Sequence, residues 1–223
     1  MKPLETRSTT GTVEMRTGEG PSRIGGYAAK FNTLSQNLGG FVERINPGFF
    51  DKSLADGADV LARYQHMDEY LLGRVSSGTL QLTRDGIGLD YTVDLPDTGY
   101  ARDIAALAAR GDLRHSSFAF RVFEDEWSLT ADDFPLRTLI TGALVDVAPV
   151  VTPAYMDTSS GLRSLAESRG MTIAAVTEAV EGNRLAELFR TKTIIDLAAR
   201  GQGETHPLMA IRKRRAELYR RTL

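Results

Sequence analysis

One stretch of the sequence contributes most to the prediction of the fold: Arg114-His115-Ser116-Ser117-Phe118-Ala119-Phe120-Arg121. Successive side chains of a β-strand point to opposite faces, so Phe118 and Phe120 would fill one face and Ser117 would lie on the other. Ser116 cannot share the face of Ser117, whereas His115 can. The stretch therefore predicts a strand that covers a core with one side and presents a hydroxyl group on the other.

Further strands are expected on both sides of this stretch, from residue 24 to about residue 153. Residues 87–95 alternate cleanly, with apolar side chains at the odd positions, and so would cover one side of a core. Residues 26–31, 41–45 and 79–83 alternate or are rich in strand-forming residues. Gly-Gly and Asp-Gly pairs between these segments indicate turns.

Helices are expected between and after the strands. Residues 46–54 begin with Asn46 as a cap and Pro47 in the first turn. Residues 97–111 have a capping residue at the start, apolar residues at helical spacing and a glycine stop. The character of the sequence changes after residue 155: residues 157–161 indicate a linker, and from residue 162 to residue 223 strand signals give way to a helical pattern.

Composition restricts the class of protein. The chain has 223 residues, 42% of them hydrophobic, which is enough for a sizeable core. It has no cysteine, which excludes disulfides, thiolate zinc sites and a cysteine nucleophile. The polar residues 1–23 are expected to form a flexible arm without a signal-peptide core, and no stretch approaches the roughly 18 apolar residues that cross a membrane.

The formal net charge of −2 argues against a dedicated nucleic-acid binder. Basic residues nevertheless gather near the C-terminus, opposed there by Glu217: Arg212, Lys213, Arg214, Arg215, Arg220 and Arg221. Such a cluster, at the end of helical and polar segments, suits docking on an acidic protein surface.

His66 and Ser117 are candidates for a base and a nucleophile. His66 follows a predicted strand at residues 60–64, and a histidine at a strand end can project into a cleft, where a pKa near neutrality suits a general base. The alternatives are a surface histidine in a loop and a serine without a catalytic role on a half-exposed strand.

Asp146 is the candidate acid, because it lies in the otherwise apolar residues 143–151. A carboxylate buried there needs a partner to offset its desolvation. One candidate partner is a histidine, whose tautomer a buried carboxylate fixes. The other candidates are three arginines: Arg74, Arg121 and Arg137.

These segments resemble, in their order, those of the prohead (capsid maturation) serine proteases of tailed bacteriophages, which are related in fold to the herpesvirus assemblins. The resemblance covers roughly residues 24 to 158, and the ordered set is more specific than any one phrase. The phrases are Gly26-Tyr27-Ala28-Ala29-Lys30-Phe31, Glu43-Arg44-Ile45-Asn46-Pro47-Gly48-Phe49-Phe50, Gln65-His66-Met67-Asp68, Leu72-Gly73-Arg74, Gly88-Leu89, Leu95-Pro96-Asp97-Thr98, Ser117-Phe118-Ala119-Phe120 and Asp146-Val147-Ala148-Pro149-Val150-Val151-Thr152-Pro153-Ala154-Tyr155.

The resemblance implies a serine endopeptidase with an α+β fold: a mostly antiparallel, barrel-like core flanked by helices and followed by a helical C-terminal appendage. The protease domain would span residues 24–158, and residues 162–223 would form a docking or autoprocessed segment. The family's base falls on His66, its nucleophile on Ser117 and its acid, commonly a glutamate, on Asp146.

Departures from the family pattern leave two alternatives at the site. Ser116 is a second candidate nucleophile. Assemblins use a second histidine as the third member, so His115 competes with Asp146, although it lies on the strand of the serine and too close in sequence to reach behind the base. Backbone N–H groups of an oxyanion hole leave no sequence signature, and Arg121 and Gly142 are the candidate contributors.

The expected function is cleavage of scaffold segments or precursor capsid protein during phage prohead maturation. The expected location is the immature prohead in the host cytoplasm. The major capsid protein precursor or scaffold is the expected partner, together with self-association, and neither a membrane nor a specific nucleic acid is expected. No metal or organic cofactor is expected, since the three histidines lack metal-ligand spacing. The alternative is a non-enzymatic, scaffold-like capsid component that retains the protease fold.

Overall fold

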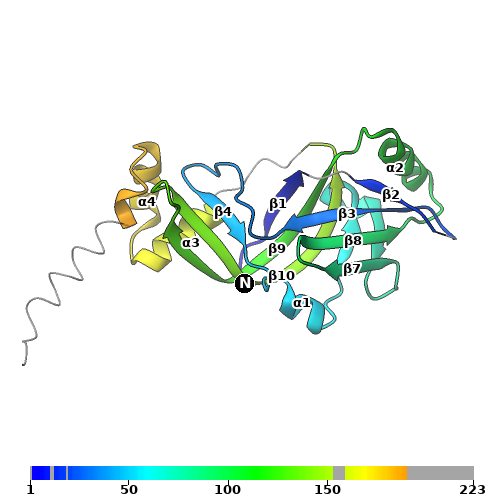
Figure 1. Ribbon diagram of the computed structural model, residues 1–223, viewed down its shortest axis with the longest axis horizontal. Helices are drawn as coiled ribbons and strands as arrows, with labels where there is room; N and C mark the ends of the chain where they lie inside the picture. Colours follow the sequence, from blue (N-terminus) through cyan, green and yellow to red (C-terminus); the bar gives the residue numbers. More distant parts are fainter. Residues whose placement is uncertain (1, 11–12, 19, 153–158, 190–223) are drawn as a thin grey trace, which may run out of the picture. The chain divides into compact units, whose positions relative to one another are not determined.

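The computed structural model describes residues 2–10, 13–18, 20–152 and 159–189, and its strands form two sheets (Figure 1). The larger sheet has the order β1-β9-β10-β5-β6, with β4 also paired to β10, and the smaller has the order β2-β3-β8-β7. The strands are β1 Glu5–Thr10, β2 Glu14–Arg16, β3 Arg23–Lys30, β4 Val42–Ile45, β5 Leu61–Arg63, β6 Leu71–Arg74, β7 Leu80–Arg84, β8 Gly88–Asp94, β9 His115–Leu129 and β10 Pro135–Val150.

The described residues include the helices α1 Asp51–Ala55, α2 Gly99–Arg110, α3 Ser159–Arg169 and α4 Ile173–Glu181, with two 3-10 turns, η1 Tyr64–His66 and η2 Asp68–Tyr70. As predicted, α2 is capped by a side chain, that of Thr98, and ends at Gly111 in the left-handed region with φ 77°. Within these ranges no helix is long and apolar enough to span a membrane.

The first helix begins later than the sequence predicts. Asn46 does not cap it; its Oδ1 instead accepts a hydrogen bond from the backbone N–H of Gly48 at 2.8 Å. An asparagine side chain that bonds the backbone two residues on closes a turn. The segment after Asn46 is therefore a turn, and α1 starts at Asp51.

The longest pairing joins β9 and β10, which run antiparallel and side by side in Figure 1. β4 and β5 add to β10 in parallel, and the other pairings are antiparallel. The α+β class and the mostly antiparallel core are as predicted. The predicted barrel-like closure is wrong, because the two sheets stay open within the described residues. Where β1 approaches β3, Thr9 Oγ1 donates a hydrogen bond to the Ala28 carbonyl (2.8 Å), and no backbone ladder joins these two described strands.

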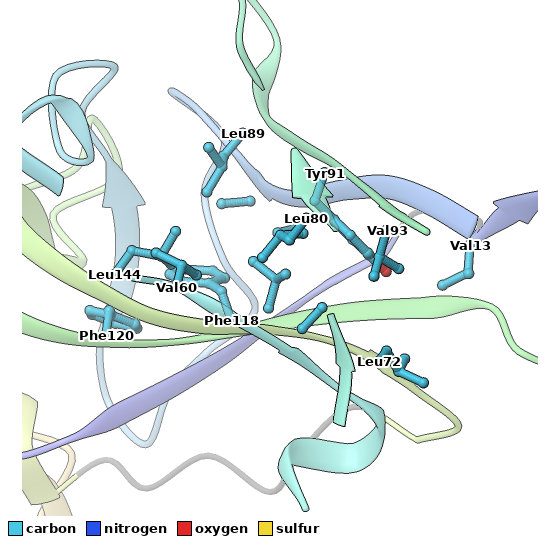
Figure 2. Close-up of a cluster of buried hydrophobic side chains, with 14 of the residues drawn as sticks. Val13, Val60, Leu72, Leu80, Leu89, Tyr91, Val93, Phe118, Phe120 and Leu144 are labelled. Carbon is cyan, nitrogen blue, oxygen red and sulfur yellow. The ribbon is translucent and has the colours of Figure 1, made fainter. Parts of the chain in front are cut away.

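The core lies between the two sheets (Figure 2). On the β9 side, Phe118 and Phe120 stack with their ring centroids 4.9 Å apart. Phe50 and Phe49, next to α1, pack edge-on against them, each with a centroid separation of 5.5 Å. Aromatic pairs favour such offset and edge-on arrangements, so this cluster fixes the aromatic face of β9 inward. The smaller sheet contributes buried side chains of β7 and β8: Leu80, Leu89, Tyr91 and Val93.

Residues 1–23 contribute two strands where the sequence predicts a flexible arm. β1 pairs with β9, and β2 pairs with β3. The charged residues of β1 do not face solvent, because Arg7 pairs with Glu5 and with Glu43 at 2.8 Å each, and Arg137 pairs with Glu5 at 2.8 Å. We call Glu5, Arg7, Glu43 and Arg137, all of them buried, the buried charge network.

Helix α3 packs beside β9. The Trp127 Nε1–H donates to Ser164 Oγ at 3.1 Å, and Ser164 Oγ donates to Asp125 Oδ2 at 2.6 Å. Leu162 and Leu165 of α3 are buried. Residues 159–161, expected as part of a linker, instead begin α3, and Ser160 and Gly161 are buried. The proposed boundary near residue 161 and the docking or autoprocessing role of residues 162–223 stay predictions, since residues 157 and 158 and the C-terminal arginine cluster lie outside the described residues.

Replacing Arg137 with methionine should lower the free energy of unfolding by about 3–5 kcal/mol, because it leaves the buried carboxylates of Glu5 and Glu43 with one counter-charge, that of Arg7, in place of two. Arg137 is 1% exposed and bonds Glu5, Glu43 and Asp125. Urea denaturation measures the change. As a control, Arg102→Ala breaks an exposed pair with Asp97 and should change the unfolding free energy by less than about 1 kcal/mol. Equal effects of the two changes would contradict a structural role for the network.

Candidate active site

Strand β9 places its two adjacent serines on opposite faces, as its alternation predicts. Ser116 shares the inward face of Phe118, and its Oγ lies 3.3 Å from the Tyr91 hydroxyl in the core. Ser117 points the other way, and its Oγ lies 2.7 Å from His66 Nε2. The geometry therefore brings Ser117, and not Ser116, to the histidine.

A β-bulge in β10 places Asp146 on the face of Ser117. Leu144 lies opposite Phe120, but Asp146 lies opposite Ala119 and Ala148 opposite Ser117. Without the register shift after Leu144, Asp146 would lie opposite Phe118 and face the core. With the bulge, Leu144 and Val147 both stay in the core while Asp146 joins the serine.

His66 reaches its position through an uncommon backbone conformation. Gln65 and His66 have φ 57° and φ 61°, in the left-handed region that non-glycine residues rarely adopt. Each such residue costs on the order of 1–3 kcal/mol and persists where its surroundings hold it. Here a backbone bond from Met67 N–H to the Tyr64 carbonyl (3.1 Å) closes the turn, and edge-on ring contacts join Tyr64 to Tyr70 and Tyr70 to Tyr100.

The three predicted site residues form one hydrogen-bonded chain. His66 Nδ1 lies 2.6 Å from Asp146 Oδ1, and His66 Nε2 lies 2.7 Å from Ser117 Oγ. A carboxylate only accepts hydrogen bonds, so Nδ1 carries the proton and donates it to Asp146. Nε2 is then unprotonated and can accept from the Ser117 hydroxyl, which is the orientation that a general base requires.

The Ser117 hydroxyl has a second acceptor. The backbone carbonyl of Arg7, in β1, lies 2.9 Å from Oγ. The hydroxyl has one proton, so a bond to Arg7 competes with the bond to His66. Ser117 is 0% exposed while the His66 side chain is 18% exposed. A substrate carbonyl can therefore reach Oγ only after residues that cover it move.

The arginine that pairs with Asp146 is Arg63, which is not among the three arginines expected from the sequence. Asp146 is 0% exposed, and its Oδ2 accepts a hydrogen bond from Arg63 Nη2. The three expected arginines are occupied elsewhere: Arg137 in the buried charge network, Arg74 with Asp59, and Arg121 with the Lys2 carbonyl. The available signal was the position of Arg63, three residues before the candidate base at the end of the predicted strand.

The other candidates lie apart from the hydrogen-bonded chain. Asp146, and not His115, occupies the Nδ1 side of His66, and His115 Nδ1 is a buried atom without a partner in the described residues. The Gly142 N–H donates to the Phe49 carbonyl at 3.1 Å and is not free to bind an oxyanion. Within the described ranges no cluster of three or more His, Cys, Asp or Glu side chains could hold a metal ion.

Burial, and then the positive charge of Arg63, lower the pKa of His66 to about 4. An isolated histidine has a pKa of about 6.5. The imidazole is therefore neutral at pH 7 and available as a base. The charged imidazolium that forms when it takes a proton is stabilised by Asp146 on Nδ1.

A hydroxyl, an imidazole and a carboxylate joined in this order form the nucleophile-activating unit of the serine hydrolases. The chain belongs to the family of caudovirus prohead serine proteases, whose family model matches residues 7–171, a range that includes Ser117, His66 and Asp146. Among solved structures, the bacteriophage T4 capsid assembly protease, gp21, matches with 11% sequence identity and a TM-score of 0.47, over 66% of this chain and 96% of that chain. A comparison with curated proteins gave no match.

The pH dependence of Ser117 acylation should reflect the lowered pKa of His66. A base works only when unprotonated, so the rate of labelling by a fluorophosphonate should fall on acidification around pH 4, well below the ordinary 6.5. Measuring labelling rates from pH 3.5 to 9, with circular dichroism to verify folding at each pH, tests this. A half-maximal rate near pH 6.5 in folded protein would contradict it.

Proposed function

We propose that the protein is a serine endopeptidase that cleaves the scaffold segment or precursor of the capsid protein during prohead maturation. Membership of the prohead serine protease family supports a capsid maturation protease. The observation that carries the serine mechanism is the continuous hydrogen-bonded chain from Ser117 through His66 to the fully buried Asp146.

In this mechanism Ser117 Oγ attacks the peptide carbonyl while His66 Nε2 takes its proton, which gives a tetrahedral intermediate. His66 then transfers the proton to the leaving amine, and the C–N bond breaks to leave an acyl-enzyme on Ser117. Water, activated by His66, hydrolyses the ester and restores the hydroxyl. Asp146 holds the Nδ1–H tautomer and stabilises the imidazolium at each proton transfer.

The expected substrates are capsid or scaffold proteins, and the expected place of action is the interior of the prohead. A protease that acts only inside the assembled shell needs a resting state in which its nucleophile is covered. The full burial of Ser117 and its bond to the Arg7 carbonyl suit such a resting state, because access to Oγ requires a local movement.

The same burial favours a second candidate function, a non-enzymatic, scaffold-like capsid component that retains the protease fold. The two candidates differ in whether the hydroxyl of Ser117 ever reacts. Covalent labelling of the wild-type chain by a fluorophosphonate, located by mass spectrometry on the Ser117 peptide, supports the protease. A folded chain that remains unlabelled supports the scaffold-like component.

Ser117→Ala should abolish processing of the precursor capsid protein in co-expression, while Ser116→Ala should retain most of it. The reason is that Ser117 Oγ contacts His66 whereas Ser116 Oγ contacts Tyr91 in the core. Gel electrophoresis of the co-expressed precursor measures processing. If Ser116→Ala abolishes processing while Ser117→Ala retains it, the nucleophile is Ser116.

Asp146→Asn should fold but acylate more slowly by a factor on the order of 10⁴, because the amide keeps the shape and loses the charge that supports the imidazolium. Fluorophosphonate labelling reactions that are quenched at successive times measure the rate. His115→Ala is the matched control, because His115 is not on the Nδ1 side of His66. A larger loss in the control would make His115 the third member of the unit.

A further inference from the structure

Arg63 connects the site to the turn that carries the histidine. It is the last residue of β5, and its side chain is 14% exposed. Nη2 donates to Asp146 Oδ2, and Nη1 donates to Asp68 Oδ1 at the start of η2. One guanidinium thus binds two carboxylates. Arg63 and Asp68 lie on either side of residues 64–67, the segment that places His66.

We propose that Arg63 is a positioning residue for the reaction, which holds the carboxylate of Asp146 turned so that Oδ1 faces the Nδ1–H of His66. This inference rests on the proposed serine mechanism and adds a fourth and a fifth group to it, Arg63 and Asp68. Arg63 does not touch Ser117 in the described contacts and acts through Asp146.

The need for such a residue follows from the burial of Asp146. A carboxylate with no exposed surface loses its hydration, and a neutral imidazole offers it one hydrogen bond on one oxygen. Without Arg63, the desolvated carboxylate would have one donor for its two oxygens and would be free to turn away from His66. Arg63 supplies a positive charge and a donor for the second oxygen.

Arg63 also affects the base directly. The groups facing His66 are Asp146 from β10, Ser117 from β9 and Arg63 from β5, with Asp68 of η2 on the far side of Arg63. The positive charge of Arg63 contributes to the lowered pKa of His66. Removing this charge should therefore raise the pKa of His66. Removing the negative charge of Asp68 should change the pKa of His66 in the opposite direction and by less. The effect is small because the Asp68 side chain is 85% exposed and screened by water.

The test compares four variants of the full chain: Arg63→Met, Arg63→Lys, Asp68→Asn and, as a matched control, Arg74→Met. Arg74 also pairs with an aspartate, Asp59, and that pair includes no residue of the site. Two readouts are used on each folded variant. One is the fluorophosphonate labelling rate as a function of pH, and the other is the pKa of His66 by NMR in the Ser117→Ala background, which does not depend on activity.

Arg63→Met should slow labelling about 10- to 100-fold, the rate equivalent of one hydrogen bond to a charged group. It should also move the pH at which labelling falls on acidification, and the pKa of His66 measured by NMR, to higher values. Arg63→Lys keeps the charge but loses the fork that bonds two carboxylates, so the pKa should stay low while the rate recovers only in part. Arg74→Met should resemble the wild-type chain in both readouts.

The outcomes separate this inference from the proposed function. If the wild-type chain is never labelled, the serine mechanism fails, while the NMR pKa still reports whether Arg63 tunes His66. If the wild-type chain is labelled and Arg63→Met leaves both rate and pKa unchanged, only the role of Arg63 is overturned. Should Arg63→Met fail to fold, Arg63→Lys decides, because unchanged labelling in that variant rules out a need for the forked contact.

Discussion

The antiparallel pairing of β9 with β10 is the constraint on which the rest of the structure depends. β10 receives β4 and β5 along its other edge, and β9 receives β1, so every strand of the larger sheet except β6 is aligned by one of these two. The inward faces carry the aromatic cluster of Phe118 and Phe120, and the outward faces carry Ser117 and Asp146. Core packing and site geometry therefore share one register, and a slip in that register would disrupt both.

Two groups of polar side chains lie at this strand pair: the buried charge network, and the hydrogen-bonded chain of Ser117, His66 and Asp146. Arg7 belongs to the network through its side chain and contacts the hydrogen-bonded chain through its backbone carbonyl. Its guanidinium lies in the buried charge network with Glu5 and Glu43, while its carbonyl accepts a hydrogen bond from Ser117. The network thereby holds β1 beside Ser117. Through Asp125, which bonds both Arg137 and Ser164, the same network extends to helix α3.

The strand at Ser117 and helix α2 could be predicted from the sequence because their signals are local: a two-residue alternation, a cap and a glycine stop. Three features could not be. The pairing of β1 depends on charges that find partners far along the chain, so polarity alone indicated a flexible arm. Arg63 faces Asp146 only because β5 joins β10 in parallel, a contact across more than eighty positions. The left-handed turn at Gln65 and His66 lacks the glycine that usually marks such a conformation.

The bulge at Val145 carries a consequence for how the site is encoded. The register shift after Leu144 decides which residue of β10 meets Ser117: with it Asp146 lies opposite Ala119, and without it Asp146 would lie opposite Phe118, in the aromatic cluster. The position of the carboxylate therefore depends on the strand pairing as well as on the residue type. Moving the bulge past Asp146 would turn the carboxylate inward even though every side chain remained the same.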